Sequence, residues 1–162
     1  MTDAKLWGGM CAQSVRILPP AESAALREAY LNAFVDRSSD HYRQYVENRI
    51  RFSDGEHYTG YLWDNLRSGV RITSQRFAHE IVRYPEVRVM ADDHSRNRVI
   101  SAPLWPYPPY SVVVLPPNLL LELLPALPED IYVFDSTVSW TLIRTHEHDA
   151  KRRICLAVGF NA

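Results

Sequence analysis

Apolar residues recur at helical spacing after a pair of prolines near the start of the chain. Leu26, Tyr30 and Ala33 are three or four residues apart, in a stretch rich in helix formers with acidic residues early in it. Such a stripe is typical of a helix that packs one face on a core. The pattern predicts a helix over about 20–36.

Further helical segments are expected up to residue 84. Residues 38–40 (Ser-Ser-Asp) can cap a helix that ends near 50, because short polar side chains accept hydrogen bonds from free backbone N–H groups. A third segment runs through 58–66 and stops near Gly69. A fourth covers 71–83, with its end set by the following proline.

The period changes from helical spacing to alternation in the second half. Apolar stretches bounded by polar turns predict five strands, at 87–91, 112–114, 131–135, 139–145 and 153–158. Residues 92–97 are expected to form the turn of a hairpin that returns through Val99-Ile100, and 146–151 a second polar turn. The proline-rich stretch 103–109 is expected to be an irregular connector, followed by a short helix at 118–124.

Helices followed by strands predict an α+β fold, with N-terminal helices packed on one face of a C-terminal, mainly antiparallel sheet. The helical part covers about 20–84 and the strand-rich part about 86–160. Each part alone would bury only a small core, so residues 1–162 are expected to form a single domain.

Composition narrows the choice of partners. Hydrophobic residues make up 46% of the chain and charged residues 23%, as in ordinary globular proteins. The net charge of −1 gives no broad positive field for a nucleic acid.

The chain opens without a secretory signal pattern and has no long apolar run, which favours the cytoplasm. Cys155, between Ile154 and Leu156, is expected to be a buried free thiol.

Two polar strings could carry chemistry. His146-Glu147-His148-Asp149 offers metal ligands or proton carriers, but it lacks the helical spacing of common zinc motifs, so a polar turn is the preferred interpretation. Metal binding and acid/base catalysis remain alternatives. Asp92-Asp93-His94 has the same ambiguity, and turn formation is favoured there also.

The chain contains no sequence motif of a nucleophile elbow, a phosphate-binding loop or a dinucleotide-binding loop. Aromatic residues are more informative, because tyrosine and tryptophan are enriched at interfaces. A tyrosine-rich segment interleaved with charges is the preferred partner-facing surface, namely Tyr42, Arg43, Tyr45, Tyr58 and Tyr61.

Three strings resemble a known group of proteins. They are Gly60-Tyr-Leu-Trp-Asp64, the Val89–Ser95 stretch with its Met-Ala-Asp-Asp-His-Ser sequence, and Tyr132–Glu147, in which Tyr-Val-Phe-Asp precedes Trp-Thr and Thr-His-Glu. Together they are similar to small bacterial immunity proteins of contact-dependent growth inhibition and related polymorphic toxin systems. The likeness covers about 55–150.

The resemblance implies a cytosolic protein that binds a toxin domain, often a nuclease, blocks its active site or substrate surface, and needs no cofactor. It also implies that the motif residues fix the fold. Asp135 would cap a turn, Trp140 would pack in the core, Glu147 would hold His146, and Trp63-Asp64 would be structural.

Two alternatives to an immunity protein stay open. One is a small metal-dependent or acid/base enzyme that uses the 146–149 string, with Asp92, Asp93 and His94 as further candidates. The other is a general protein-interaction module.

Overall fold

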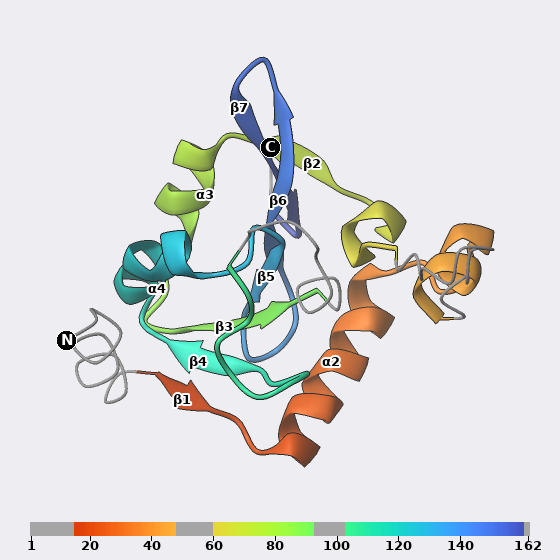
Figure 1. The fold of residues 1–162 in the computed structure, drawn as a ribbon, viewed down its shortest axis with the longest axis horizontal. Coiled ribbons are helices and arrows are strands. Elements are labelled where there is room, and N and C mark those ends of the chain that lie inside the picture. The colour runs from red at the N-terminus through yellow and green to blue at the C-terminus, as the bar shows by residue number, and fades with distance from the viewer. Residues whose placement is uncertain (1–14, 48–59, 93–102, 161–162) are drawn as a thin grey trace.

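Seven strands form one antiparallel sheet in the computed structural model, which describes residues 15–47, 60–92 and 103–160 (Figure 1). Their order across the sheet is β1-β4-β3-β5-β6-β7-β2. The strands are β1 (Arg16–Ile17), β2 (Val70–Ile72), β3 (Val87–Ala91), β4 (Val113–Leu115), β5 (Ile131–Phe134), β6 (Thr141–Asp149) and β7 (Arg152–Val158). The predicted α+β class with a mainly antiparallel sheet is confirmed.

Helices cover both faces of the sheet, whereas the sequence pattern led us to expect one covered face. In Figure 1, α2 (Pro20–Phe34) lies on one side of the central strands, and α3 (Ser74–Ile81) and α4 (Pro117–Leu123) lie on the other. The reason is visible in β5, whose four residues are all buried. A strand that is apolar on both faces needs cover on both.

Each face has its own core. On one face, Phe77 and Ile81 of α3 and Leu120 of α4 pack on apolar residues of β3 to β7. On the other face, Tyr30 and Phe34 of α2 pack on residues such as Met90, Val114, Tyr132, Phe134 and Ile143. The sheet is therefore the shared middle layer, and strands from both parts of the chain contribute to it.

The predicted helix over 20–36 is confirmed as α2, which has Pro20 in its first turn and ends at Phe34. Tyr30 is fully buried and Leu26 half-buried, but Ala33 is exposed. The buried face instead includes Ser23, whose hydroxyl donates to the Leu18 carbonyl at 3.1 Å and accepts from a backbone N–H of the β4 end at 3.0 Å. This hydroxyl ties the start of α2 to the sheet.

The segments after α2 are shorter than predicted. The expected Ser39 cap exists, since its hydroxyl accepts from the Tyr42 N–H at 3.0 Å, and a π-helical turn follows at Tyr42–Glu47; its expected end near 50 lies outside the described residues. The predicted helix over 58–66 is wrong within the described chain, where only a 3₁₀ turn forms at Leu62–Asn65.

The predicted helix over 71–83 begins too early. Its first residues form β2, in which Ile72 pairs with Cys155 of β7. Helix α3 starts only after Thr73, whose hydroxyl accepts from the Arg76 N–H at 3.0 Å and so caps the helix. The threonine cap therefore separates a strand from a helix within one apolar stretch.

The predicted polar turn over 146–151 is wrong, because β6 continues to Asp149. The turn consists of Ala150 and Lys151, both with positive φ (44° and 70°). Positive φ at both central residues is the geometry that matches the twist of a two-residue hairpin. A register shift between Arg144 and His148 shows that β6 is irregular as it passes the candidate residues.

The stretch 103–109 is irregular, as predicted, and leads into β4 and α4 close to the expected positions. The expected hairpin at 92–97 and Val99-Ile100 falls mostly outside the described residues. The described neighbours of β3 are β4 and β5. Across residues 15–47, 60–92 and 103–160, no helix combines the length and apolarity that a bilayer crossing requires.

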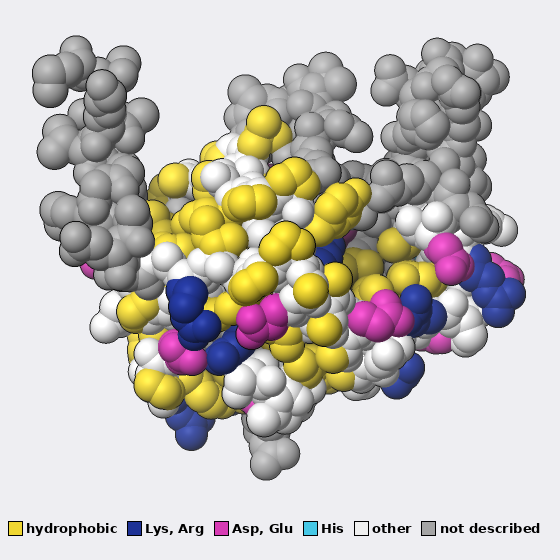
Figure 2. All heavy atoms as spheres, turned by 90° about the horizontal axis from the view of Figure 1, so that it is seen from below, with side chains coloured by type: hydrophobic (Ala, Val, Ile, Leu, Met, Phe, Trp, Pro, Cys, Tyr) yellow, Lys and Arg dark blue, Asp and Glu magenta, His cyan; other side chains and the backbone are white. Residues whose placement is uncertain are grey.

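The surface on the side of β1 and the start of α2 is partly apolar. Figure 2, which views the molecule from below, shows hydrophobic side chains gathered there between a few basic and acidic groups. Large exposed apolar side chains of the described chain include Ile17, in β1, and Leu104. Apolar surface of this extent is common on globular proteins, so it does not by itself mark a binding site.

Candidate functional site

Two buried carboxylates lie side by side where β3 ends and β5 begins. Asp92 follows β3 and Asp130 precedes β5, and each is only 4% exposed. The antiparallel pairing of Ala91 with Ile131 brings these two positions together. Buried carboxylates are costly unless hydrogen bonds satisfy their oxygens, so the partners of each define what it does.

Asp130 connects a tryptophan and a histidine. Its Oδ1 accepts hydrogen bonds from the Trp63 indole Nε1–H at 3.0 Å and from the His146 backbone N–H at 3.1 Å. The His146 ring Nδ1 is 3.0 and 3.1 Å from the two carboxylate oxygens. Because a carboxylate only accepts, Nδ1 carries the proton, and a neutral ring then leaves Nε2 as an acceptor.

Asp92 holds the 3₁₀ turn against the sheet. It accepts hydrogen bonds from the Leu62 N–H at 3.1 Å and from the Tyr132 hydroxyl. The same hydroxyl oxygen accepts from the Trp63 N–H at 3.1 Å. Burial and the neighbouring carboxylate raise the pKa of Tyr132 well above its usual value, so it remains a donor at physiological pH.

These buried hydrogen bonds hold a small aromatic surface in place, and acidic side chains lie beside it. The rings of Tyr61 and Trp63 stack with centroids 5.2 Å apart, and the His146 ring lies 4.8 Å from that of Tyr61. All three are half-buried, while Asp64 and Glu147 are exposed. We call these five residues the Trp63 surface.

The environment of Asp64 differs from that of a free carboxylate in solution. Desolvation by the surrounding protein raises its pKa, and Glu147 pushes the pKa further up while His41 opposes this effect. The pKa is therefore raised in the free protein. A cationic partner placed against Asp64 and Glu147 would relieve this repulsion.

The structure brings together several candidates that are far apart in the sequence: Tyr61, Trp63, Asp64, Asp92, His146 and Glu147. It does not gather the 146–149 string at one point. The His148 Nδ1 bonds to the His146 carbonyl oxygen at 3.0 Å, and His148 lines a different groove together with Asp149. In the part of the chain that the structure describes, no three His, Cys, Asp or Glu side chains are placed to hold a metal ion.

The expectation that Glu147 holds His146 is wrong. Asp130, which is not among the predicted site residues, takes this role because it lies next to β6 at the start of β5. A sequence signal exists: Asp130 is an acid placed directly before a strand of four apolar residues. Asp93 and His94 lie outside the described residues.

The tyrosine-rich surface expected from the sequence is divided. Tyr42 is 5% exposed and belongs to the core beneath α2, so it offers little to a partner. Tyr45 is half-buried, with its ring 4.8 Å from that of His41, and Arg43 is exposed. Tyr58 lies outside the described residues, and Tyr61 belongs to the Trp63 surface.

Two motif residues have the structural placements that the resemblance implied. Trp140 is 6% exposed and packs on Tyr84 and Phe160, with ring centroids 4.4 and 5.3 Å away. Asp135 accepts hydrogen bonds from the Ser139 N–H at 2.7 Å and from the hydroxyls of Ser139 and Thr137. It therefore closes the turn between β5 and β6.

We expect Asp135→Asn to destabilise the protein at neutral pH by about 1 kcal/mol, since a charged acceptor is lost. Desolvation acts to raise the Asp135 pKa, but the hydrogen bonds from Ser139 and Thr137 outweigh it and lower the pKa. The carboxylate's contribution is thus complete above the unfolded value of about 3.9 and is lost as pH falls through the folded pKa. Urea unfolding at pH 7 and near pH 3 should show the difference from wild type shrinking in acid.

Asp149→Asn is the matched control for this prediction. Asp149 is exposed and makes no hydrogen bond or ion pair through its side chain with a described residue, so its substitution should change stability little at either pH. An Asp135→Asn difference that persists unchanged in acid would contradict the assignment.

Cys155 is 1% exposed, and burial raises the pKa of its thiol, which confirms the predicted buried free cysteine.

Family models, curated proteins and solved structures yield no match to this chain. The site offers an aromatic surface anchored by buried hydrogen bonds, two exposed acids, and one imidazole oriented by a buried carboxylate.

Proposed function

We propose that the protein is a cytosolic immunity protein that binds a toxin domain and neutralises it by occlusion, without a cofactor. The Trp63 surface is the proposed contact face. The observation that carries the proposal is the aromatic group of Tyr61, Trp63 and His146, held in place by Asp92 and Asp130 and flanked by Asp64 and Glu147.

Rigidity supports a role in binding. Aromatic side chains provide large contact area at a small cost in conformational entropy, and they are frequent among residues that dominate binding energy. Here the backbone and the indole of Trp63 are both hydrogen-bonded to buried groups of the sheet. A partner would thus meet a surface that is already in its bound shape.

Charge supports a basic partner. The net charge of the chain is close to zero, so complementarity must be local. Asp64 and Glu147 supply two acids at the edge of the aromatic group. The substrate-binding surface of a nuclease is basic, which makes a nuclease toxin a suitable partner for this face.

The test is neutralisation of a toxin domain, for which the genes neighbouring this one are the first place to search. Wild-type protein should form a complex and restore growth of cells that express the toxin. Asp64→Lys/Glu147→Lys should weaken binding by roughly ten- to a hundred-fold, because each new cation would face a basic surface. Calorimetric titration and growth rescue measure the two effects.

The control pair Glu22→Lys/Glu122→Lys makes the same charge change at exposed positions on α2 and α4. It should bind and protect like wild type. The proposal is overturned by the absence of a complex at micromolar concentrations, and the contact face is wrong if both pairs protect equally.

A second candidate function is acid/base catalysis by His146. The bond from its Nδ1–H to Asp130 is the arrangement that orients an imidazole for proton transfer at Nε2. His146→Gln separates the two functions. An immunity protein that acts by occlusion should lose toxin affinity and protection together. An enzyme that inactivates the toxin by acid/base catalysis should lose protection while its affinity for the toxin is unchanged.

A further inference from the structure

A cationic groove lies where the chain leaves β2 for α3. Strand β2 pairs only with residues 155–157 of β7, so the first residues of β7 extend past its end. The groove between this part of β7, the β6–β7 turn and residues 71–75 has a volume of about 710 Å³. Its lining includes Arg71, Lys151, Arg152 and Arg153, against a single acid, Asp149.

Three of these cations have no counter-charge of their own. Among the described residues, no carboxylate lies within ion-pair distance of Arg71, Lys151 or Arg152, and all three side chains are exposed. Arg153 is held in place, since its guanidinium donates to the Thr145 carbonyl at 2.6 Å and lies 3.6 Å from Glu129. The groove therefore combines one fixed guanidinium with three cations available to a ligand.

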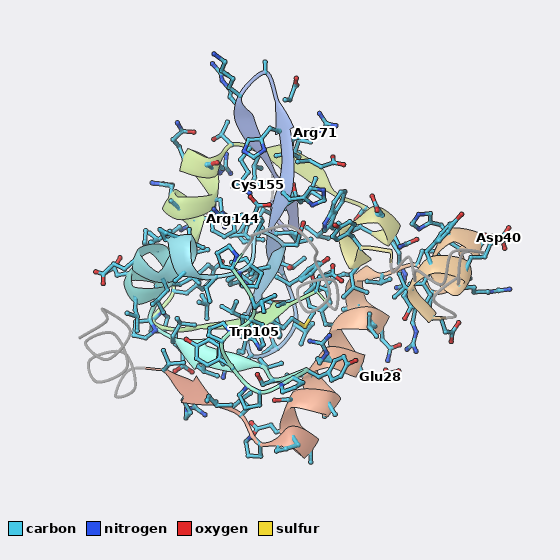
Figure 3. The ribbon with its side chains drawn as sticks, viewed as in Figure 1. Glu28, Asp40, Arg71, Trp105, Arg144 and Cys155 are labelled. Atoms are coloured by element: carbon cyan, nitrogen blue, oxygen red, sulfur yellow. The ribbon has the colours of Figure 1, made fainter. Side chains whose placement is uncertain are left out.

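A further cation, Arg144, lies on the neighbouring strand β6 and interacts electrostatically with Arg153 of the groove. Figure 3 shows Arg71, Cys155 and Arg144 on the neighbouring strands β2, β7 and β6, and Arg144 pairs directly with Cys155. Arg144 is half-buried and makes no ion pair or side-chain hydrogen bond within the described chain. Burial first, and then repulsion from Arg153, lower its pKa. A cluster of like charges on a partly buried surface favours the entry of an anion.

We propose that this groove binds a small ligand that carries several phosphate groups. A guanidinium group can bind a phosphate through two parallel hydrogen bonds to its oxygens. The cations are spread around a space much larger than one phosphate needs. The volume is within the range of small-molecule sites. The exposed side chains of Thr73, Ser74 and Gln75 add further polar groups to the lining.

The lining argues against two other anionic partners. Recognition of single-stranded nucleic acid relies on aromatic side chains that stack on bases, and the groove lining contains none. Protein segments usually dock with several apolar anchors, whereas Ile72 and Ile154 are the only two apolar residues of this lining and the rest are polar or charged. A compact polyanion needs neither feature.

Inorganic tripolyphosphate is the probe for this groove, titrated by calorimetry into the full chain at low ionic strength. Wild type should bind at one site. Arg71→Gln/Arg152→Gln should weaken binding by roughly ten-fold or more, because each removed guanidinium loses a charge-assisted contact. Arg43→Gln/Arg67→Gln, which removes two exposed cations elsewhere, should change the affinity by less than about two-fold.

Each outcome decides the proposal. The absence of binding at millimolar tripolyphosphate overturns it, and so does an equal loss in the two double variants, which would indicate general attraction to a polyanion. Tighter, groove-dependent binding of a single-stranded RNA oligomer or a polyglutamate peptide would replace the ligand class. The substituted side chains are exposed, and thermal melting of each variant verifies folding. The result is independent of toxin neutralisation.

Discussion

Replacement of Tyr30 by alanine is expected to lower the free energy of unfolding by about 3–5 kcal/mol, the largest effect that we predict for a single substitution. Tyr30 is fully buried, and its ring makes edge contacts with Phe34, Tyr132 and Phe134 at centroid distances of 4.9, 5.6 and 5.2 Å. The change would leave a cavity between α2 and the sheet. Urea unfolding followed by circular dichroism measures the loss.

Tyr30→Phe divides this effect into its parts. It keeps the ring but removes the hydroxyl, which shares a 2.8 Å hydrogen bond with the Thr141 hydroxyl. The Thr141 hydroxyl also donates to the Val133 carbonyl at 3.0 Å, so it keeps one partner. We therefore expect a loss of only about 1 kcal/mol. Equal losses in the two variants would show that ring packing contributes little.

Replacement of Asp130 by alanine is expected to destabilise the protein by about 3 kcal/mol, because several donors lose a charged acceptor together. The Trp63 indole and the backbone and ring N–H groups of His146 all bond to this carboxylate. We also expect the aromatic surface to loosen, so that the Trp63 indole becomes more accessible to a soluble quencher. Denaturant unfolding and fluorescence quenching measure the two effects.

Asp130→Asn is the discriminating control, since it retains one acceptor oxygen and nearly the same shape. Its loss of stability should be smaller than that of the alanine variant. A stable Asp130→Ala protein with unchanged quenching would mean that the surface is held by packing alone, and the argument for a rigid contact face would fail.

Most regular elements could be predicted from the sequence where one local pattern decides the outcome. Helix α2 and strands β3 and β5 have strong periodicity and clear boundaries. Strand β2 was missed because it is three residues long and is followed at once by α3, so that Ile72 was grouped with Phe77, Ile81 and Val82 in one helical pattern. Only the pairing with β7, which is distant in the chain, makes Ile72 a strand residue.

The candidate site could be predicted only in part. Trp63, Asp92 and His146 were singled out, but their association depends on sheet order, and Asp130 became important only once β5 was placed next to β3 and β6. The string at 146–149 was misinterpreted because polar residues at the end of a hairpin resemble a loop. In a strand that extends beyond the body of the protein, both faces are exposed to solvent, so polarity does not end the strand.

The strand order has a consequence for synthesis on the ribosome. Strand β2 pairs along its length with β7, which is translated roughly eighty residues later. Until β7 leaves the exit tunnel, the residues of β2 have no strand to join, and α3 has only part of the surface on which it packs. The fold is therefore completed only after β7 has emerged, and until then the apolar face of α3 lacks the strands on which it packs.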